Sequence, residues 1–365
     1  MSGSVPESDR SKAAIETLAS HPERIDVRSP SEFAEDHIPG ASNHPVLSDA
    51  ERARIGTMHA QDSAFAARRA GAALVARNIA AMLEGPFADK PRGWAPLVYC
   101  WRGGQRSRSL AHMLNEIGWR AAQLVGGYRA YRRHVVGALG TLPGAFRYKV
   151  VCGLTGSGKS RLIAALAAEG AQVLDLEALA RHRGSLLGDL PDDPQPSQKS
   201  FESELVAALQ RFDPAHPVYV ESESRRIGAV QMPDALLAAM RAAECIRLEL
   251  PRPDRIDLLK REYAHFLSDH ATLTARLMRL VPLHGKSTIE HWADAVRTGA
   301  WDTLVGELLE RHYDPLYLRS IERNFPRIAE AVDVTPAAVS DAAFRSLARE
   351  LTATMQVRST ACSDR

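Results

Sequence analysis

Short apolar runs alternate with helical spacings of apolar residues through the first third of the chain. Three such runs predict strands, at residues 24–28, 97–99 and 123–125. Ser29 and Glu32 have the spacing of a capping box, which predicts a brief helix directly after the first strand. Apolar periodicity predicts a longer helix over 63–83 and another that ends at Gly118. This alternation of strands and helices favours an α/β domain over residues 11–136.

The same alternation resumes after a segment rich in glycine and proline. Residues 137–146 contain three glycines and one proline, and they predict a linker. Four further apolar runs predict strands, at 148–152, 172–174, 218–220 and 245–250. We therefore expect a second α/β domain over 147–250, followed by a helical extension over 251–353. The polar, aperiodic ends of the chain, 1–10 and 354–365, are expected to be disordered.

Composition is consistent with this two-domain organisation. The chain has 365 residues, of which 45% are hydrophobic, and this is enough for two cores. Its four cysteines lie far apart, without C-x-x-C spacing: Cys100, Cys152, Cys245 and Cys362. This spacing argues against a disulfide framework and against the usual zinc sites, so we expect a cytoplasmic protein. No apolar stretch approaches membrane-spanning length, so no membrane partner is expected.

A loop rich in glycine and arginine, CWRGGQRSR, begins at Cys100 where an apolar run ends. Successive backbone N–H groups in such a loop form an anion-binding concavity, and the guanidinium groups of Arg102 and Arg106 favour an ionised sulfur. The loop precedes a predicted helix, whose dipole adds to this preference. Cys100 is therefore our candidate nucleophile, with Arg102 and Arg106 as its catalytic partners. A buried core cysteine at a strand end is the alternative.

Positive charge is concentrated after this cysteine. Residues 102–147 contain eight arginines and a single acidic residue, Glu116, although the whole chain has a net charge of only +2. Tryptophans and tyrosines are interleaved with these arginines, a pattern that suits a polyanion whose bases can stack. The RNA-binding candidates, two later basic loops included, are Arg108, Arg129, Arg132, Arg133, Arg181, Arg183 and Arg226. A solvated basic face is the alternative.

Residues 153–160, GLTGSGKS, match the phosphate-binding pattern G-x-x-x-x-G-K-[ST]. They lie between a predicted strand and an amphipathic helix, which is the context that this motif requires. The backbone N–H groups of such a P-loop hold a di- or triphosphate, while Lys159 neutralises its charge and Ser160 is a candidate ligand of Mg²⁺. The predicted phosphate-binding residues are Gly153, Gly156, Ser157, Gly158, Lys159 and Ser160.

Acidic residues follow two strands of the second predicted domain. Asp175 follows one strand, and Glu221 and Glu223 follow the next. The carboxyl ends of parallel strands meet at one edge of a sheet, so these carboxylates are candidates for positioning a metal ion or a water beside the P-loop. Acids that merely cap a helix are the alternative. None of the histidines has a known catalytic spacing, and His182 and His312 are the two to test.

Several of these segments together resemble one known family. Asp26-Val27-Arg28 and His37-Ile38-Pro39-Gly40-Ala41, followed by the Cys100 loop, are similar to a rhodanese domain. That domain followed by a P-loop domain, with GGYRAYR at 126–132 and RHRGS at 181–185, resembles the tRNA 2-selenouridine synthase family. The resemblance spans nearly all of the chain. It implies an N-terminal rhodanese-like domain, then a P-loop NTPase-like α/β domain with a helical C-terminal extension.

The resemblance also implies a reaction on tRNA. Wobble 2-thiouridine is expected to be S-geranylated with geranyl diphosphate. Selenium from selenophosphate then replaces the geranylthio group, with release of geranyl thiol and phosphate. The implied partners are the tRNA anticodon arm and a protein that supplies selenophosphate. No tightly bound cofactor is expected, and Mg²⁺ is expected as a co-factor of the diphosphate site.

The spacing within the Cys100 loop bears on the selenium step. Arg106 lies six positions after Cys100, which makes the loop one residue longer than that of rhodaneses that carry only a sulfane sulfur. This wider loop suits a tetrahedral anion such as selenophosphate. We expect the Cys100 thiolate to attack its selenium and form an enzyme-bound selenylsulfide, while the loop N–H groups and Arg106 hold the phosphate.

Three other functions are compatible with the same motifs. A rhodanese-type sulfurtransferase fused to an ATP-dependent kinase would use Lys159 for nucleotide phosphoryl transfer. A cysteine phosphatase shares the C-x₅-R spacing but leaves the P-loop without a role. A non-enzymatic RNA-binding regulator would use both loops only for docking, and substitution of Cys100 would then change nothing.

Overall fold

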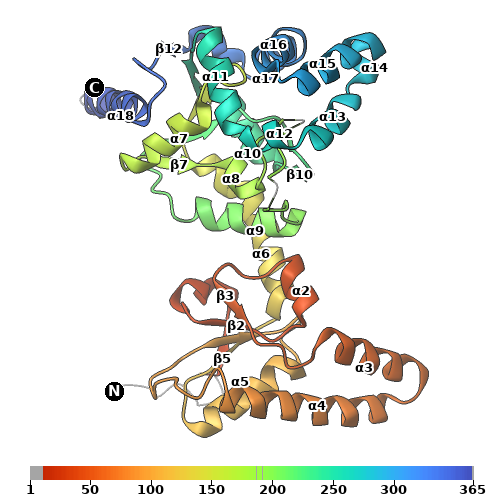
Figure 1. The fold of residues 1–365 in the computed structure, drawn as a ribbon. Coiled ribbons are helices and arrows are strands. Elements are labelled where there is room, and N and C mark those ends of the chain that lie inside the picture. The colour runs from red at the N-terminus through yellow and green to blue at the C-terminus, as the bar shows by residue number, and fades with distance from the viewer. Residues whose placement is uncertain (1–10, 186, 191, 364–365) are drawn as a thin grey trace. The chain divides into compact units, whose positions relative to one another are not determined.

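Two compact units make up the protein. The computed structural model describes residues 11–185, 187–190 and 192–363, so the tail predicted over 1–10 lies outside the described residues. The units are Met1–Leu139 with Pro196–Ala207, and Gly140–Gln195 with Ala208–Arg365. Each contains a five-stranded parallel sheet with helices packed around it (Figure 1). The predicted α/β fold class is confirmed.

The sheet of the first unit has the strand order β1-β5-β4-β2-β3. Its strands are β1 (Lys12–Ala13), β2 (Arg24–Asp26), β3 (Ala41–Asn43), β4 (Leu97–Tyr99) and β5 (Ala122–Leu124). Its helices are η1 (Ile15–Ser20), α2 (Pro30–Glu35), α3 (Asp49–Gln61), α4 (Ala64–Glu84), α5 (Gln105–Ile117) and α6 (Gly127–Thr141). All three residues of β4 are buried, as expected for a central parallel strand that is covered on both faces. The capping box of Ser29 and Glu32 begins α2, as predicted.

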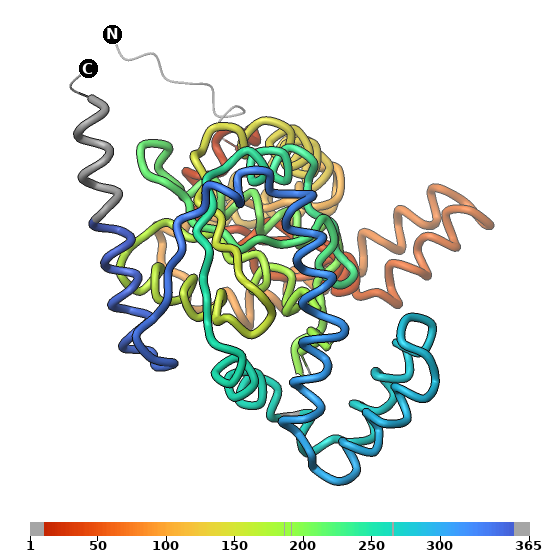
Figure 2. Tube along the Cα trace, turned by 90° about the horizontal axis from the view of Figure 1, so that it is seen from above, coloured from red at the N-terminus to blue at the C-terminus, as the bar shows by residue number. Residues whose placement is uncertain are grey.

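Helices α3 and α4 lie side by side and project from this sheet (Figures 1 and 2). Helix α4 is the one predicted over 63–83, whereas α3 was not predicted. No residue of α3 is buried, so its sequence lacks the apolar periodicity that indicates a helix. The signal that remains is local, because Ser48 and Glu51 form a capping box at its N-terminus.

The second sheet has the order β12-β11-β6-β8-β7. Its strands are β6 (Tyr148–Cys152), β7 (Gln172–Leu174), β8 (Val218–Glu221), β11 (Glu244–Leu248) and β12 (Val332–Val334), and β9 (Arg226–Ile227) and β10 (Val230–Gln231) form a separate hairpin. The helices around it are η2 (Leu142–Ala145), α7 (Lys159–Ala168), α8 (Leu176–Ala180) and α10 (Asp234–Arg241). Strand β12 corrects the helical extension predicted over 251–353, because it pairs with β11 at the edge of the sheet.

The rest of the C-terminal extension is helical, as predicted. It consists of α11 (Arg252–Glu262), α12 (Ala264–Ser268), α13 (His270–Met278), α14 (Val281–His284), α15 (Lys286–Thr298), α16 (Trp301–Leu308), η3 (Leu309–Tyr313), α17 (Asp314–Asn324), η4 (Pro326–Glu330) and α18 (Asp341–Ser363). Helix α18 replaces the tail predicted from residue 354, and residues 364–365 lie outside the described part. Phe344 and Leu347 of α18 are buried in one core with α7. None of the described helices is long and apolar enough to cross a bilayer.

The segment predicted as a linker, 137–146, is the end of α6 followed by η2. Gly137 and Gly140 lie within α6, where a helix tolerates single glycines at a modest cost. Between β7 and β8, helix α9 (Gln198–Leu209) contributes its residues up to Ala207 to the first unit. The P-loop domain predicted over 147–250 is therefore not contiguous, because most of this helix packs with the first unit.

Helix α9 is attached to the first unit by a buried polar cluster around Asp36. Its carboxylate accepts hydrogen bonds from the hydroxyls of Tyr128 (2.6 Å) and Ser203 (3.1 Å). Arg132 lies 3.7 Å from the same carboxylate and forms an ion pair of 2.5 Å with Glu202. Burial raises the pKa of Asp36, although these partners oppose the shift. Because buried polar groups are costly when unpaired, the cluster fixes the position of α9.

Gly127 allows α6 to begin directly against the loop that follows β4. Its φ is +57°, and a Cβ there would lie 2.2 Å from the Cys100 carbonyl oxygen and 2.4 Å from the Gly103 nitrogen. The next residue, Tyr128, donates its N–H to the Cys100 carbonyl at 2.8 Å. Any side chain at position 127 would therefore push this loop away from α6.

We expect Gly127→Ala to destabilise the first unit by about 2–4 kcal/mol, because it combines a positive φ with a backbone clash. The control is Gly137→Ala in the same helix, where a Cβ would meet no atom within 4 Å outside its own helix. This control should gain up to about 1 kcal/mol from helix propensity. Urea denaturation measures both changes. Equal stability of the two variants would contradict the proposed close approach.

Candidate functional site

The Cys100 loop connects β4 to the N-terminus of α5. The Cys100 Sγ accepts hydrogen bonds from the Gly104 N–H (3.3 Å) and from the Ser107 hydroxyl (3.1 Å). Gly104 is the N-cap of α5, so the sulfur lies at the positive end of the helix dipole. Cys100 is only 3% exposed and also contacts the apolar core. Its sulfur therefore has hydrocarbon on one side and hydrogen-bond donors on the other.

Gln123 holds this loop in place from the neighbouring strand β5. Its side-chain amide donates hydrogen bonds to the carbonyl oxygens of Gly103 (3.0 Å) and Gly104 (3.1 Å) and to the Ser107 hydroxyl (2.8 Å). The Ser107 hydroxyl is thus oriented from behind while it donates to Cys100. Gln123 was not predicted as a site residue, and the only available signal was its position in the strand after α5.

The predicted arginine partners of Cys100 differ in their surroundings. Arg106 forms an ion pair with Glu32 at 2.9 Å, and Glu32 is also 3.1 Å from Arg52. Burial alone would raise the pKa of Glu32, but the hydrogen bond and charge of Arg106 and the other partners lower it. Arg102 is exposed. The positive charge of Arg106 is therefore partly neutralised by Glu32, and its role as an anion ligand stays a prediction.

The P-loop connects β6 to α7, and its glycines lie against neighbouring side chains. A Cβ at Gly156 would lie 2.8 Å from Leu259, and one at Gly158 would lie 2.6 Å from Phe344. Both glycines have positive φ, so larger residues are excluded on two grounds. The Lys159 ammonium donates a hydrogen bond to the Gly153 carbonyl at 2.9 Å and therefore lies across the loop.

Three carboxylates meet beside this loop. One ligand atom from each of Glu177, Glu221 and Glu223 lies within 4.8 Å of the other two. The Ser160 hydroxyl donates to Glu177 at 3.0 Å and lies 3.5 Å from Glu221. Glu221 is fully buried, and its second oxygen has no hydrogen-bond partner among the described residues. Sequence analysis identified Glu221 and Glu223, and the structure adds Glu177.

Asp175 does not belong to this cluster. Its carboxylate caps α8 by accepting the N–H of Ala178 at 2.8 Å. The alternative considered for strand-end acids, helix capping, therefore applies to Asp175. Glu177 lies two positions further along, in the first turn of α8, and the short helix directs its side chain to the P-loop. The sequence signal for Glu177 was weak, because it depends on where α8 begins.

The carboxyl groups of this cluster hold protons more tightly than usual. Burial, followed by the charge of Glu223, raises the pKa of Glu177 to about 7 from its ordinary 4.5. Burial also raises the pKa of Glu221, and the charges of Glu177 and Glu223 add to this effect. Such crowding is relieved by a divalent cation, and carboxylate and hydroxyl oxygens are the ligands that Mg²⁺ prefers. The residues present therefore fit a Mg²⁺ ion.

The predicted RNA-binding arginines are separated by the structure into two groups. Three of them have exposed side chains with no evident structural role: Arg108, Arg129 and Arg133. The side chains of the other four contact other parts of the protein. Arg132 pairs with Glu202 and Arg181 with Asp193, and Arg183 and Arg226 donate to the carbonyls of Glu262 and Gly228. The two histidines selected for testing, His182 and His312, are both buried. His182 lies 3.3 Å from Asp189, and His312 is 3.0 Å from His284.

A parallel α/β unit with a cysteine loop, followed by a unit with a P-loop and an acid cluster, defines a two-site rhodanese and P-loop protein. Two family models match the chain: a rhodanese-like domain over residues 10–134, and the tRNA 2-selenouridine synthase AAA domain over residues 146–280. The chain belongs to the tRNA 2-selenouridine synthase family.

Three relatives with the name tRNA 2-selenouridine synthase illustrate this membership. The protein from Nitrosomonas europaea is 37% identical over 246 residues, which are 66% of this chain and 63% of that protein. The one from Aeromonas salmonicida is 32% identical over 336 residues, and the match covers 83% of this chain and 88% of that protein. The one from Bdellovibrio bacteriovorus is 31% identical over 339 residues, and the match covers 82% of this chain and 89% of that protein.

Replacing Glu221 with Gln should remove the response of the protein to Mg²⁺. Because Glu177 titrates at about 7 instead of 4.5, the metal-free wild type should lose stability as the pH rises through this window. At pH 8 without divalent ions we expect Glu221→Gln to melt at the same temperature as the wild type or higher. Added MgCl₂ should raise the melting temperature of the wild type but not that of the variant.

The matched control is Glu290→Gln, which changes an exposed glutamate on α15. It should respond to MgCl₂ as the wild type does in thermal melts. A lower melting temperature of metal-free Glu221→Gln, or an undiminished Mg²⁺ effect in it, would contradict the cation site.

Proposed function

We propose that this protein is a tRNA-modifying transferase that converts wobble 2-thiouridine to 2-selenouridine. Family membership supports the class of reaction, since the named relatives are tRNA 2-selenouridine synthases. The observation that carries the proposal is the pairing, in one chain, of a hydrogen-bonded cysteine loop with a P-loop that has its own acid cluster. Two distinct anion sites suit a reaction with two anionic co-substrates.

The P-loop is the proposed site of geranyl diphosphate. Its N–H groups and Lys159 hold the diphosphate, and the thiouridine sulfur attacks C1 of the geranyl group. The C1–O bond breaks, pyrophosphate leaves with the bonding electrons, and the base loses its N3 proton. Mg²⁺ held by Ser160, Glu177, Glu221 and Glu223 would supply further positive charge to the leaving group.

The Cys100 loop is the proposed site of selenophosphate. S-geranylation converts a poor leaving group into an isothiourea sulfur, which departs readily as geranyl thiolate when selenium attacks C2 of the base. The Gly104 N–H and the Ser107 hydroxyl donate to Cys100 Sγ and so hold the sulfur that would react with selenium at the start of α5. The tetrahedral anion would lie at the N-terminus of α5.

The electron balance distinguishes two roles of the Cys100 loop: a covalent bond between Cys100 and selenium, or binding of selenophosphate alone. If Cys100 bonds to selenium, the Se–P bond breaks with its electrons on phosphorus, so phosphite is released and a thiol must later cleave the S–Se bond. If the loop only holds selenophosphate, selenium attacks C2 directly, and water then attacks phosphorus to release phosphate. The phosphorus product, measured by ³¹P NMR, identifies the route.

Two substitutions should divide the reaction into its halves. On the route through a bond between Cys100 and selenium, Cys100→Ser should abolish selenium incorporation and leave geranylation intact. Lys159→Ala should lower geranylation by at least about 100-fold, because the leaving diphosphate loses its main counter-charge. Mass spectrometry of nucleosides from thiolated tRNA, geranyl diphosphate and selenophosphate measures both products.

Rescue with pre-geranylated tRNA provides the control. It should restore selenouridine formation in Lys159→Ala but not in Cys100→Ser. Loss of both steps in Cys100→Ser would argue against separate sites. Absence of any geranylated or selenated nucleoside with the wild type, together with ATP turnover, would favour the sulfurtransferase fused to a kinase.

Binding of tRNA should depend on the exposed arginines of α6. Arg129→Gln and Arg133→Gln should each weaken binding and reduce the slope of log K against log salt by about one, because each removes one phosphate contact. Arg319→Gln on α17 is the exposed control. Filter binding at several salt concentrations measures the slopes. Unchanged slopes in both α6 variants would remove this surface from the RNA site.

A further inference from the structure

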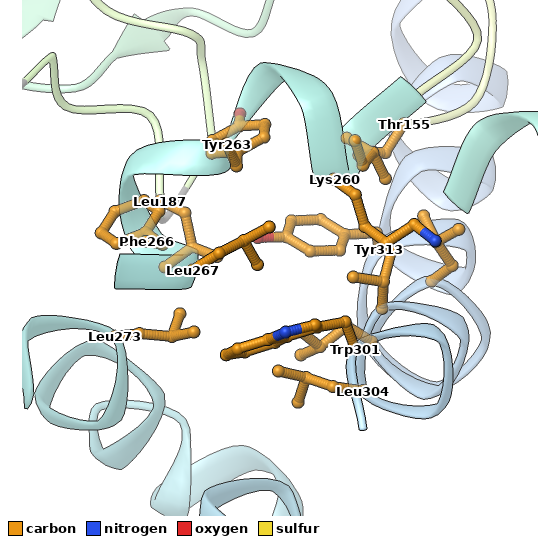
Figure 3. Close-up of a pocket in the computed structure, with 15 residues that line it drawn as sticks. Thr155, Leu187, Lys260, Tyr263, Phe266, Leu267, Leu273, Trp301, Leu304 and Tyr313 are labelled. Carbon is orange, nitrogen blue, oxygen red and sulfur yellow. The ribbon is translucent and has the colours of Figure 1, made fainter. Parts of the chain in front are cut away.

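An apolar cavity lies in the helical region of the second unit. It is lined by side chains of α11, α12, α13, α16 and η3, with an empty volume of about 590 Å³ that includes its open mouth. Figure 3 shows Thr155 on one side of the cavity and Leu187, Phe266 and Leu273 on the other.

The cavity borders the diphosphate site at two points. Thr155, which lines it, is part of the P-loop itself. Ser185, which also lines it, follows Gly184, where a Cβ would lie 2.8 Å from the Glu223 carboxylate. A ligand with its phosphates in the P-loop and beside the acid cluster can therefore extend directly into the cavity.

The lining offers almost nothing that a polar ligand could bind. Its one charged side chain among the described residues is Lys260, whose ammonium forms ion pairs with Asp257 (2.9 Å) and Asp302 (2.5 Å). The Tyr263 hydroxyl lies 3.4 Å from the Ser185 hydroxyl, so these two polar groups face each other. A nucleobase or a sugar would be desolvated here without compensation, whereas a hydrocarbon chain would not.

A second cavity beside the P-loop has a mixed lining, with apolar side chains such as Leu248, Leu318 and Ile321 beside charged ones. It is lined by Gly153 and Ser157 of the loop and by four charged residues, Arg247, Glu249, Arg255 and Glu322. Burying a hydrocarbon against these groups would displace their hydration. The first cavity, which has one charged side chain in its lining against four in the second, therefore suits an apolar chain better.

We propose that the apolar cavity holds the hydrocarbon chain of a prenyl diphosphate whose diphosphate lies in the P-loop. This inference rests on the proposed function and adds the subsite that recognises the chain. Leu267 of α12 and Val305 of α16 form part of its walls, and Leu187 lies at the side away from Thr155. The wall residues determine affinity for the chain, and Leu187 limits its length.

Isothermal titration calorimetry with geranyl diphosphate and with inorganic pyrophosphate tests this assignment. The wild type should bind geranyl diphosphate at least about tenfold more tightly than pyrophosphate. Leu267→Trp and Val305→Trp, which fill the cavity, should weaken geranyl diphosphate binding by about tenfold or more and leave pyrophosphate binding unchanged. The control, Leu283→Trp, changes a leucine that is 67% exposed on α14 and should alter neither affinity.

A chain-length test covers the case in which a tryptophan variant fails to fold. Leu187→Ala removes a partly exposed side chain and should shift the preference from geranyl to farnesyl diphosphate by about fivefold or more. Unchanged geranyl diphosphate affinity in folded tryptophan variants, or an unchanged preference in Leu187→Ala, would overturn the assignment.

The outcome also separates this inference from the proposed function. If the wild type forms geranylated thiouridine while the cavity variants keep full affinity for geranyl diphosphate, the subsite is wrong and the function stands. If the wild type binds pyrophosphate but gains nothing from the geranyl chain and forms no geranylated tRNA, both are wrong.

Discussion

Close approach of neighbouring atoms to the backbone at glycines is the constraint on which both sites depend: backbone atoms at Gly127, and side chains at Gly156 and Gly158. In each unit a parallel strand runs into a loop, and the loop enters a helix whose first N–H groups have no partner within the helix. Gly127 lets α6 begin within contact of the Cys100 loop, and Gly156 and Gly158 let the P-loop lie against α11 and α18. Without these contacts the N–H groups would not converge on one point. The chemistry of each site follows from what else is placed beside those N–H groups.

The two loops differ in the charge that surrounds them, and this difference supports the different ligands that we propose for them. Donors around the Cys100 sulfur come from Gly104 and Ser107, and the charge of Arg106 is partly neutralised by Glu32. An anion there needs no metal. Beside the P-loop, three carboxylates would repel an anion unless a cation lay between them. This contrast supports the proposal of a diphosphate with Mg²⁺ at the P-loop and of an oxyanion without a metal at the Cys100 loop.

Sequence motifs predicted the loops because their chemistry depends on residues adjacent in the chain. The nine residues from Cys100 and the eight of the P-loop each form one site segment. Glu177 was missed and Asp175 was chosen in its place, because the two lie only two positions apart at the start of a short helix. Where that helix begins determines which of the two carboxylates points to the site. Helix α3 has no buried face, and β12 is a three-residue edge strand, so neither has a strong pattern. The assignment of α9 to the first unit depends on partners as distant in sequence as Asp36 and Ser203.

The apolar cavity gives the proposed prenyl transfer a property that the P-loop alone could not. An allylic diphosphate reacts through a C1 centre that becomes electron-poor as pyrophosphate leaves, and water would capture it as readily as a thiouridine sulfur. Side chains such as Phe266 and Leu304, both almost fully buried, would exclude water from a chain bound in the proposed position. Lys159, Ser160 and the acid cluster, which are proposed to assist departure of the diphosphate, lie outside the cavity lining. Separation of the apolar cavity lining from the charged P-loop and acid cluster would therefore favour transfer of the prenyl group to the base over hydrolysis.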